Sequence, residues 1–343
     1  MPFKAVDILG ISILINYEDM FKQAGVEVEL AVNPCSMEAT EDDVITAIGD
    51  ADAAIAQASF QPFSRKVLGS LSRCKLIASI GVGYEKLDVG AATELGILAT
   101  NVPDASTEEV SDHAMGLILA CTRRICQLNQ VVKKGEWKAI ADPSISGEIW
   151  PKLSRLQGQT LGLIGLGRIA QALVRKAKGF GLRIVACDPF IAEGIFQQLG
   201  VERVDLEQLL AQSDIVSIHA PLTAETECLL GLEQLQRMKP GACLINTARG
   251  AEVDHEALYT VLSQGHLSAA AVDVTEPEPI PTDSPLLGLD NFIITAHSAG
   301  ISPPAFAELQ RRPALEVIRL VKGEWPVGLL NPEVKEKYHQ RWS

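Results

Sequence analysis

Short apolar runs alternate with amphipathic stretches along the first third of the chain. The apolar runs predict strands at residues 6–15, 26–32, 53–56, 76–80 and 97–99. Apolar residues spaced three and four apart predict helices between them, including residues 18–24, 41–48 and 89–95. Continuous apolar strands joined by helices are typical of a parallel sheet covered on both faces. We therefore expect a small parallel α/β domain in this part of the chain.

The alternation is interrupted near residue 100. An Asn-Val-Pro-Asp segment at 101–104 precedes residues 106–124, which predict one long helix with a Ser/Thr cap and acidic residues in its first turn. Such a helix could carry the chain from one domain to the next. Residues 135–158 contain prolines, glycines and two tryptophans. This composition favours an irregular excursion that packs on a neighbour over a flexible linker.

A second set of strands follows, again alternating with helical segments. Six strands are predicted at residues 161–164, 183–187, 215–219, 243–246, 270–274 and 292–295, as in a dinucleotide-binding domain. Right-handed crossovers place the carboxyl end of every strand on one edge of the sheet, where we expect the chemistry. Residues 303–322 predict a final helix, which Pro313 could interrupt and which would return the chain to the first domain.

A glycine turn follows the first strand of this second set. The segment Gly-Leu-Gly-Arg-Ile-Ala occupies 165–170, and Asp188 ends the next strand. Gly165 and Gly167 allow a tight bend and close approach to a pyrophosphate, which the free N–H groups of the following helix would bind. Ala170 lets that helix pack on the strand, and Asp188 can accept hydrogen bonds from both ribose hydroxyls. These residues predict a dinucleotide cofactor in preference to an ordinary glycine-rich turn.

The residues around Asp188 also indicate which dinucleotide binds. The carboxylate would repel a 2′-phosphate, and the following Pro189 and Phe190 offer no arginine to receive one. The sequence therefore predicts NAD as the cofactor, in preference to NADP.

The position of the glycine turn predicts the domain organisation. Roughly 160 residues precede it, enough for a domain of their own. We expect the α/β class with two doubly wound parallel-sheet domains. A Rossmann NAD-binding domain would span residues 102–302, inserted in a flavodoxin-like substrate-binding (catalytic) domain made of residues 1–101 and 303–343.

Composition narrows the class of protein. The 343 residues are 47% hydrophobic and 21% charged, as in a globular chain with a sizeable core. A net charge of −13 argues against nucleic acid or an anionic membrane as partner. The seven cysteines form no C-x-x-C pair. The apolar residues 6–15 are preceded by only one basic residue, Lys4, which argues against a secretory signal peptide. No apolar run is long enough to span a membrane. We expect a cytoplasmic protein with reduced thiols and no metal site.

Three residues beyond the ends of the later strands could carry the chemistry of 2-oxo acid reduction. Arg249 can bind a substrate carboxylate with two hydrogen bonds and stays charged at physiological pH. His297 can exchange a proton with the carbonyl oxygen, and Glu278 can fix the tautomer of that ring. A bound nicotinamide supplies the hydride. Each residue alone is more often structural, but their joint placement on one edge of the sheet favours a catalytic site.

The ordered motifs resemble those of the D-isomer-specific 2-hydroxyacid dehydrogenases. The resemblance covers nearly the whole chain, and the ordered set is far more specific than any single motif. Its motifs are the glycine turn at 165–170, His-Ala-Pro-Leu-Thr at 219–223, Asn-Thr-Ala-Arg-Gly at 246–250, Asp-Val at 273–274, Glu-Pro-Glu-Pro at 276–279, Thr-Ala-His at 295–297, and upstream Gly-Val-Gly-Tyr at 81–84 and Asn-Val-Pro at 101–103.

The resemblance implies roles for individual residues. Arg249, Glu278 and His297 correspond to the catalytic Arg, Glu and His of the family, and the backbone amides of Val82 and Gly83 would hold the substrate carboxylate opposite Arg249. Besides Gly165 and Gly167, the implied cofactor contacts are Arg168 and Ile169 at the pyrophosphate, Asp188 at the ribose, Ala220, Pro221 and Thr226 at the adenosine half, Thr247 and Ala248 near the nicotinamide ribose, Asp273 at the carboxamide, and Ser106 across the cleft.

The resemblance also implies an assembly and a motion. We expect a homodimer built around the helix at 106–124 and the excursion at 135–158. The two domains would close on the substrate, which excludes water from the path of the hydride. Because the chain ends shortly after Asn331-Pro332-Glu333, we expect no C-terminal regulatory domain.

One alternative of another class stays open. The stretch at 101–106 and the run from Asp188 to Val201 are also similar to C-terminal-binding proteins, NAD-dependent corepressors that keep the catalytic triad. Those proteins carry a tryptophan three residues beyond the histidine, where this chain has Gly300, which weakens that interpretation.

The sequence alone does not identify the substrate. Its pocket would form from loops near Ile80, Ile301 and Trp150 of the partner subunit, so glyoxylate, hydroxypyruvate and 3-phosphoglycerate types all stay open. Phosphite dehydrogenases have a lysine where Val82 stands, and formate dehydrogenases lack the partner that Glu278 provides, so both are set aside.

Overall fold

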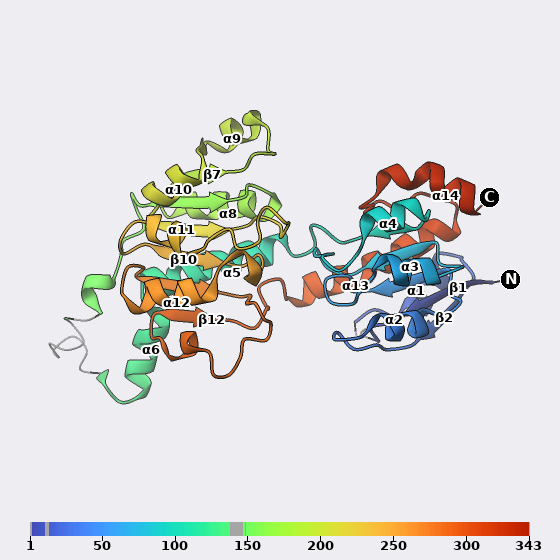
Figure 1. Cartoon of the computed structure of the whole chain (residues 1–343), viewed down its shortest axis with the longest axis horizontal. Helices are drawn as coiled ribbons and strands as arrows, with labels where there is room; N and C mark the ends of the chain where they lie inside the picture. Colours follow the sequence, from blue (N-terminus) through green and yellow to red (C-terminus); the bar gives the residue numbers. More distant parts are fainter. Residues whose placement is uncertain (1, 11–13, 138–146, 148, 343) are drawn as a thin grey trace. The chain divides into compact units, whose positions relative to one another are not determined.

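The computed structural model of the chain describes residues 2–10, 14–137, 147 and 149–342. These residues form two compact units, the first made of Met1–Ser106 and Ser302–Ser343 and the second of Thr107–Ile301. Each unit has its own parallel sheet with helices on both faces (Figure 1). The predicted fold class, with two doubly wound α/β domains, is confirmed.

The first unit has a five-stranded sheet in the order β2-β1-β3-β4-β5. The strands are β1 Phe3–Asp7, β2 Val28–Val32, β3 Ala53–Ala56, β4 Leu76–Ser79 and β5 Leu98–Thr100. The helices are α1 Tyr17–Gln23, α2 Glu41–Ile48, α3 Arg65–Ser70, α4 Val89–Glu94, α13 Pro303–Val321 and α14 Lys335–Trp342, with a 3-10 turn at Pro332–Val334. Helices α2, α3 and α4 contribute Val44, Leu68 and Ala92 to the core on one face of the sheet. On the other face, α1 and α13 contribute Phe21 and Val317.

The second unit has a seven-stranded sheet in the order β12-β11-β10-β9-β6-β7-β8. Its strands are β6 Thr160–Ile164, β7 Arg183–Cys187, β8 Glu202–Arg203, β9 Ile215–Ile218, β10 Cys243–Asn246, β11 Ala269–Val272 and β12 Phe292–Ile294. Its helices are α5 Thr107–Thr122, α6 Ile125–Lys133, α8 Arg168–Gly179, α9 Glu193–Leu199, α10 Leu206–Gln212, α11 Leu232–Arg237 and α12 His255–Ser263, with 3-10 turns at Trp150–Lys152, Gly250–Glu252 and Pro285–Gly288. Figure 1 shows α11 and α12 on one side of this sheet and α5 on the other, and separate apolar clusters fill the two faces.

The first predicted strand is misplaced. It was expected at 6–15, whereas β1 is Phe3–Asp7. The Asp7 carboxylate accepts hydrogen bonds from the N–H groups of Leu9 (2.8 Å) and Gly10 (3.1 Å), which turns the chain out of the sheet. Ile8 and Leu9 are buried all the same, so their hydropathy marks the core without marking a strand.

Two other differences concern breaks in helices. The helix expected at 106–124 ends at Thr122, because Arg124 takes a left-handed conformation (φ 51°) and α6 begins after it. Pro313 does not interrupt α13, which runs through it. Pro313 is buried, and its neighbours Ala314 and Val317 belong to the core on this face of the sheet. This packing offsets the backbone hydrogen bond that proline cannot donate. The short elements β8, α3 and α14 were not predicted from the sequence. Much of the predicted excursion at 135–158 lies outside the described residues.

Candidate active site on the second sheet

The predicted catalytic residues follow three neighbouring strands at one edge of the second sheet. Arg249 follows β10, Glu278 lies in the loop after β11, and His297 follows β12. The three strands are adjacent and parallel, with Leu244 beside Ala270 and Ala270 beside Phe292 in the register. All three loops therefore leave the sheet at its carboxyl edge.

His297 and Glu278 are in direct contact. The Nδ1 atom of His297 lies 2.6 Å from Oε1 of Glu278, and the two side chains are 37% and 33% exposed. The backbone N–H of His297 donates to the carbonyl of Asp273 at 2.8 Å, and its φ of 47° is unusual for a residue other than glycine. The ring is thus fixed by a carboxylate from the next strand while it stays accessible to a small molecule.

Asp273 holds the loop that carries His297. Its carboxylate is 1% exposed and accepts hydrogen bonds from the Thr295 hydroxyl (2.5 Å) and from the N–H groups of Ser298 (3.0 Å) and Ala299 (2.8 Å). The Nε2 atom of His113 on α5 lies 2.9 Å from the Thr295 hydroxyl and extends the network. Sequence reasoning missed His113 because it occurs in the middle of a helix, far from the motifs.

The backbone around Arg249 is held in three ways. Its carbonyl accepts from Asn246 Nδ2 (2.7 Å), and its N–H donates to Glu252 Oε2 (3.0 Å). A Cβ atom on Gly250 would lie 2.0 Å from the carbonyl carbon of Thr275, so the two backbones pack directly on each other at a glycine. The loop of Arg249 is therefore fixed against the segment that leads to Glu278.

Glu252 is a buried acid that sequence reasoning missed. It is 0% exposed, its Oε2 accepts from the Arg249 N–H, and its Oε1 has no hydrogen-bond partner among the described residues. Burial raises the pKa of this carboxyl group to about 7, and its bond to the Arg249 backbone and the charge of Arg249 offset part of the rise. In the sequence, Glu252 is one acid among several near a helix start, where acidic residues are ordinary.

The glycine turn has the backbone geometry of an anion site. Gly165 has a φ of 86°, and a Cβ there would lie 2.8 Å from the N atom of Ala220. Gly167 caps the start of α8 without a side-chain hydrogen bond, so the first N–H groups of the helix have no acceptor from their cap. Arg168 is exposed and Ile169 half-buried in the first turn. These features fit a pyrophosphate.

Asp188 is engaged with the glycine turn itself. Its Oδ2 accepts from the N–H of Leu166 at 2.8 Å, and its Oδ1 accepts from the N–H of Phe190 at 2.9 Å. Arg203 of β8 donates through Nη2 to the Asp188 carbonyl at 3.2 Å. Pro189 and Phe190 offer no arginine, as the sequence showed, but Arg203 approaches Asp188 from β8. This neighbour was not foreseen because β8 was not predicted.

The remaining predicted cofactor contacts lie on loops after β9 and β10. Ala220 is half-buried and Pro221 exposed, and the Thr226 hydroxyl donates to the Pro221 carbonyl at 2.7 Å. The Thr247 hydroxyl is buried without a hydrogen-bond partner among the described residues, and Ala248 is half-buried beside it. A buried hydroxyl without a partner is expected where a ligand completes the site.

Three predicted residues belong to the first unit. Asn101 Nδ2 donates to the Val82 carbonyl at 2.7 Å, which holds the loop after β4. Within the described residues, the N–H groups of Val82 and Gly83 donate no hydrogen bond, so both are available to an anion. Ser106, the last residue of the first segment of this unit, is 7% exposed. Their roles toward substrate and cofactor stay predictions.

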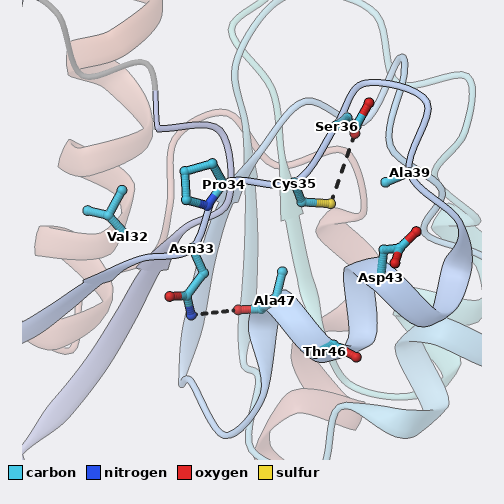
Figure 2. A pocket seen from close by; sticks show the side chains of 9 residues that line it. All are labelled: Val32, Asn33, Pro34, Cys35, Ser36, Ala39, Asp43, Thr46 and Ala47. Atoms are coloured by element: carbon cyan, nitrogen blue, oxygen red, sulfur yellow. Dashed lines mark hydrogen bonds between the residues drawn. The ribbon is translucent and has the colours of Figure 1, made fainter.

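A hollow of about 650 Å³ in the first unit lies apart from these residues. The end of β2, the loop that follows it and one side of α2 line it (Figure 2). Its polar groups are bound locally, since Asn33 Nδ2 donates to the Ala47 carbonyl at 3.0 Å and the Asp43 carboxylate accepts from Thr40. The Thr40 bonds hold the pKa of Asp43 below its usual value. The hollow offers no acid–base pair like His297 with Glu278.

The described residues hold neither a metal-ligand cluster nor a membrane-spanning helix. They contain no cluster of three or more His, Cys, Asp or Glu side chains arranged for a metal ion. None of their helices has the length and apolar character needed to cross a membrane.

The family follows from a match over more than half of the chain. Residues 115–299 match the model of the D-isomer specific 2-hydroxyacid dehydrogenase NAD binding domain. The chain belongs to this family. The matched residues contain the glycine turn, Asp188 and all three strand ends that carry Arg249, Glu278 and His297. The predicted family, the NAD cofactor and the assignment as an NAD-dependent oxidoreductase are confirmed.

Individual 2-hydroxyacid dehydrogenases match along most of the chain. It is 40% identical to a glyoxylate reductase of Korarchaeum cryptofilum over 293 residues, 85% of this chain and 86% of that one. It is 38% identical to a D-3-phosphoglycerate dehydrogenase of Methanocaldococcus jannaschii over 85% of this chain, but the match spans only 54% of that longer protein. The crystal structure of a D-lactate dehydrogenase from Aquifex aeolicus complexed with NAD and lactic acid superposes with a TM-score of 0.77, at 27% identity over 94% of this chain and 96% of that one.

Proposed function

We propose that this protein interconverts a D-2-hydroxy acid and its 2-oxo acid, with NAD as the hydride carrier. The observation that carries the proposal is the 2.6 Å contact between His297 Nδ1 and Glu278 Oε1 at the carboxyl edge of an NAD-binding sheet. Reduction of a 2-oxo acid needs a proton donor at the carbonyl oxygen and a cation at the carboxylate. His297 and Arg249 meet these two needs, and Glu278 orients the imidazole.

His297 acts as the acid in reduction and as the base in oxidation. With Nδ1–H donated to Glu278, Nε2 is the nitrogen that exchanges a proton with the substrate oxygen. The Glu278 carboxylate also stabilises the charged imidazolium that forms when a hydroxy acid gives up its proton. When bound, the nicotinamide accepts or donates the hydride at the carbon that bears this oxygen.

Arg249 holds the substrate carboxylate and so orients the carbonyl toward His297. A guanidinium can make two parallel hydrogen bonds to a carboxylate, which fixes the plane of the acid as well as its position. The backbone N–H groups of Val82 and Gly83 are further donors that we assign to the same carboxylate, because neither has an acceptor in the described part of the chain.

The cofactor contacts extend along the same edge of the sheet. We assign the pyrophosphate to the turn of Gly165 and Gly167 with the N–H groups of Arg168 and Ile169, and the adenosine ribose to Asp188. The other assigned contacts are Ala220, Pro221 and Thr226 at the adenosine, Thr247 and Ala248 at the nicotinamide ribose, and Asp273 and Ser106 near the nicotinamide. The Thr247 hydroxyl, which is buried and has no partner in the described part of the chain, supports its assignment most directly.

We assign the substrate to the smaller 2-oxo acids, with glyoxylate first. The glyoxylate reductase relative matches over 85% of this chain and 86% of its own length, whereas the phosphoglycerate dehydrogenase relative is far longer than its matched part. We also propose that the protein is a homodimer, which size-exclusion chromatography with light scattering measures directly.

The test is a panel of 2-oxo acids assayed by the loss of NADH absorbance. We expect turnover with glyoxylate or hydroxypyruvate that His297→Ala lowers by at least about 100-fold. The competing hypothesis is an NAD(H)-sensing, corepressor-like binding module with the same fold. It predicts tight NADH binding without turnover on any acid of the panel, and none of the relatives described above is named as such a protein.

A further inference from the structure

A second hollow lies at the opposite end of the seven-stranded sheet. It measures about 490 Å³ and includes residues just before three strands, namely Gly241, Ser268 and Asn291. Because these strands are parallel, their amino ends face away from the edge that carries Arg249 and His297. None of the residues assigned to substrate or cofactor lines this hollow.

The hollow contains a buried cation without a carboxylate partner. Arg124 lines it, is 3% exposed, and donates through Nη2 to the carbonyl (2.7 Å) and hydroxyl of Ser268. Its Nε is buried without a hydrogen-bond partner, and no Asp or Glu of the described residues lies within ion-pair distance of the guanidinium. A buried charge without an opposite charge is unfavourable, so an anion that completes the site is expected to bind.

The start of α6 adds to the positive character of the hollow. Arg124 is the N-cap of this nine-residue helix and provides no side-chain acceptor for its first N–H groups. Gln127 in the first turn lines the same hollow. A helix start with free N–H groups favours an anion, and here it coincides with a buried guanidinium.

Two exposed charges at the hollow act in opposite directions. Lys152 is a second cation in the lining, and Asp290 is a carboxylate in it. Neither forms an ion pair within the part of the chain that the structure describes. Lys152 should therefore favour an anionic ligand, and Asp290 should oppose it.

We propose that this arginine hollow, lined by Arg124, Gln127, Lys152, Ser268 and Asp290, binds a phosphate-class dianion. The ligand is either free phosphate or the phosphate group of a small metabolite, for which a volume of about 490 Å³ leaves room. The guanidinium and the helix start contact the anion, and the hydroxyl of Ser268 is a further donor. The site is separate from the hydride-transfer edge, so the inference does not depend on the proposed reaction.

The test is calorimetric titration of inorganic phosphate into the intact protein at constant ionic strength. NAD is kept saturating throughout, so that the glycine turn at 165–167 cannot account for the binding. We expect one site per chain. Arg124→Gln should weaken binding about 30-fold or more, since it removes a buried charge that contacts the anion.

Arg124→Gln also removes the bond to Ser268 and could unfold the chain, so two surface variants carry the test independently. Lys152→Gln should weaken phosphate binding about threefold, and Asp290→Asn should tighten it by a similar factor. Lys134→Gln, at the other end of α6, is the matched control and should leave the affinity unchanged. A phosphomonoester such as glycerol phosphate, run in parallel, binds more tightly than phosphate if the natural ligand is a metabolite and equally if it is the free ion.

Two results would overturn the proposal. One is that phosphate binds neither to the wild-type protein nor to Asp290→Asn. This result is expected, for example, when a second copy of the chain covers the hollow. The other is binding that Arg124→Gln, Lys152→Gln and Asp290→Asn all leave unchanged, which would place the anion elsewhere.

Discussion

The Nδ1 atom of His297 lies 2.6 Å from Oε1 of Glu278, although the loops that carry them leave different strands, β12 and β11. A second link joins the same loops, the hydrogen bond from the His297 N–H to the Asp273 carbonyl at 2.8 Å. The imidazole is therefore positioned from two sides before any substrate binds. Such preorganisation is what an acid–base pair requires.

Removing the imidazole should lower turnover strongly without loss of cofactor binding. His297→Ala is expected to lower kcat about 10²- to 10⁴-fold, because the substrate oxygen loses its proton donor. Glu278→Gln keeps a hydrogen-bond acceptor for Nδ1 but removes the charge, so a smaller decrease in kcat is expected. NADH binding, followed by fluorescence, should be unchanged in both variants.

His339→Ala is the matched control, since His339 is exposed on α14 in the other unit. It should keep the wild-type kcat. If His297→Ala retains more than about a tenth of the wild-type kcat, His297 is not the acid–base group.

The sequence predicts where the candidate site lies because a parallel sheet imposes it. Once the strands ending near Asn246, Val272 and Ile294 are recognised, right-handed crossovers bring the residues that follow them to one edge. The motifs then identify Arg249 and His297 among those residues. Periodicity and handedness, which are local properties of the chain, are sufficient for this step.

The contacts that stabilise the site could not be predicted in the same way. His113 reaches Thr295 from a helix 182 positions earlier in the chain, and nothing local marks it. Arg203 lies beside Asp188 because the two-residue strand β8 pairs with β7, and such a short strand has no hydrophobic pattern. Glu252 has the hydropathy of a surface residue but is buried. Each depends on tertiary packing, which overrides the local pattern.

Arg249→Lys should impair the binding of the substrate more than that of the cofactor. Lysine keeps the charge but cannot form two parallel hydrogen bonds to a carboxylate. We expect kcat/KM for the oxo acid to fall about 10- to 100-fold, chiefly through a higher KM, as for loss of a charge-assisted hydrogen bond. The KM for NADH should not change, and Arg237→Lys on the surface of α11 is the control. An unaltered KM for the oxo acid would remove Arg249 from the substrate carboxylate.

Asp188 and Arg203 together should set the preference between NADH and NADPH. The wild-type protein should prefer NADH, because the Asp188 carboxylate repels a 2′-phosphate. Asp188→Ala should lower kcat/KM for NADH and raise it for NADPH, since it removes the carboxylate that repels the 2′-phosphate. Arg203, which donates to the carbonyl of residue 188 at 3.2 Å and pairs with Glu193 at 3.5 Å, then remains as a cation beside it.

The double variant Asp188→Ala with Arg203→Gln tests the role assigned to the arginine. It should lose the activity with NADPH that Asp188→Ala gains. The ratio of the two specificity constants is the measurement, with a single oxo acid throughout. A wild-type protein that prefers NADPH, or a double variant as active with NADPH as Asp188→Ala, would contradict this prediction.

Glu252 should make the stability of the protein depend on pH. Burial raises the pKa of its carboxyl group from an ordinary 4.5 to about 7. Below about pH 4, the carboxyl group is protonated in both the folded and the unfolded chain, so it does not change the free energy of unfolding. As the pH rises toward 7, the unfolded chain ionises first, so the free energy of unfolding decreases. Above about pH 7 the decrease is complete, and the shift corresponds to about 3 kcal/mol.

Glu252→Gln isolates this effect, because an amide of nearly the same shape does not titrate. Its Oε1 can still accept from the Arg249 N–H, while its unpaired NH₂ group adds a cost that is the same at every pH. Relative to wild type, the variant should therefore gain about 3 kcal/mol of stability between pH 4 and pH 8, measured by urea unfolding at a series of pH values. Glu207→Gln on the exposed face of α10 should show no such gain. A difference in the free energy of unfolding between Glu252→Gln and wild type that stays constant over this range would contradict the prediction. It would mean that Glu252 is ionised in the folded protein, with a partner or water molecule at its Oε1 that offsets the cost of burial.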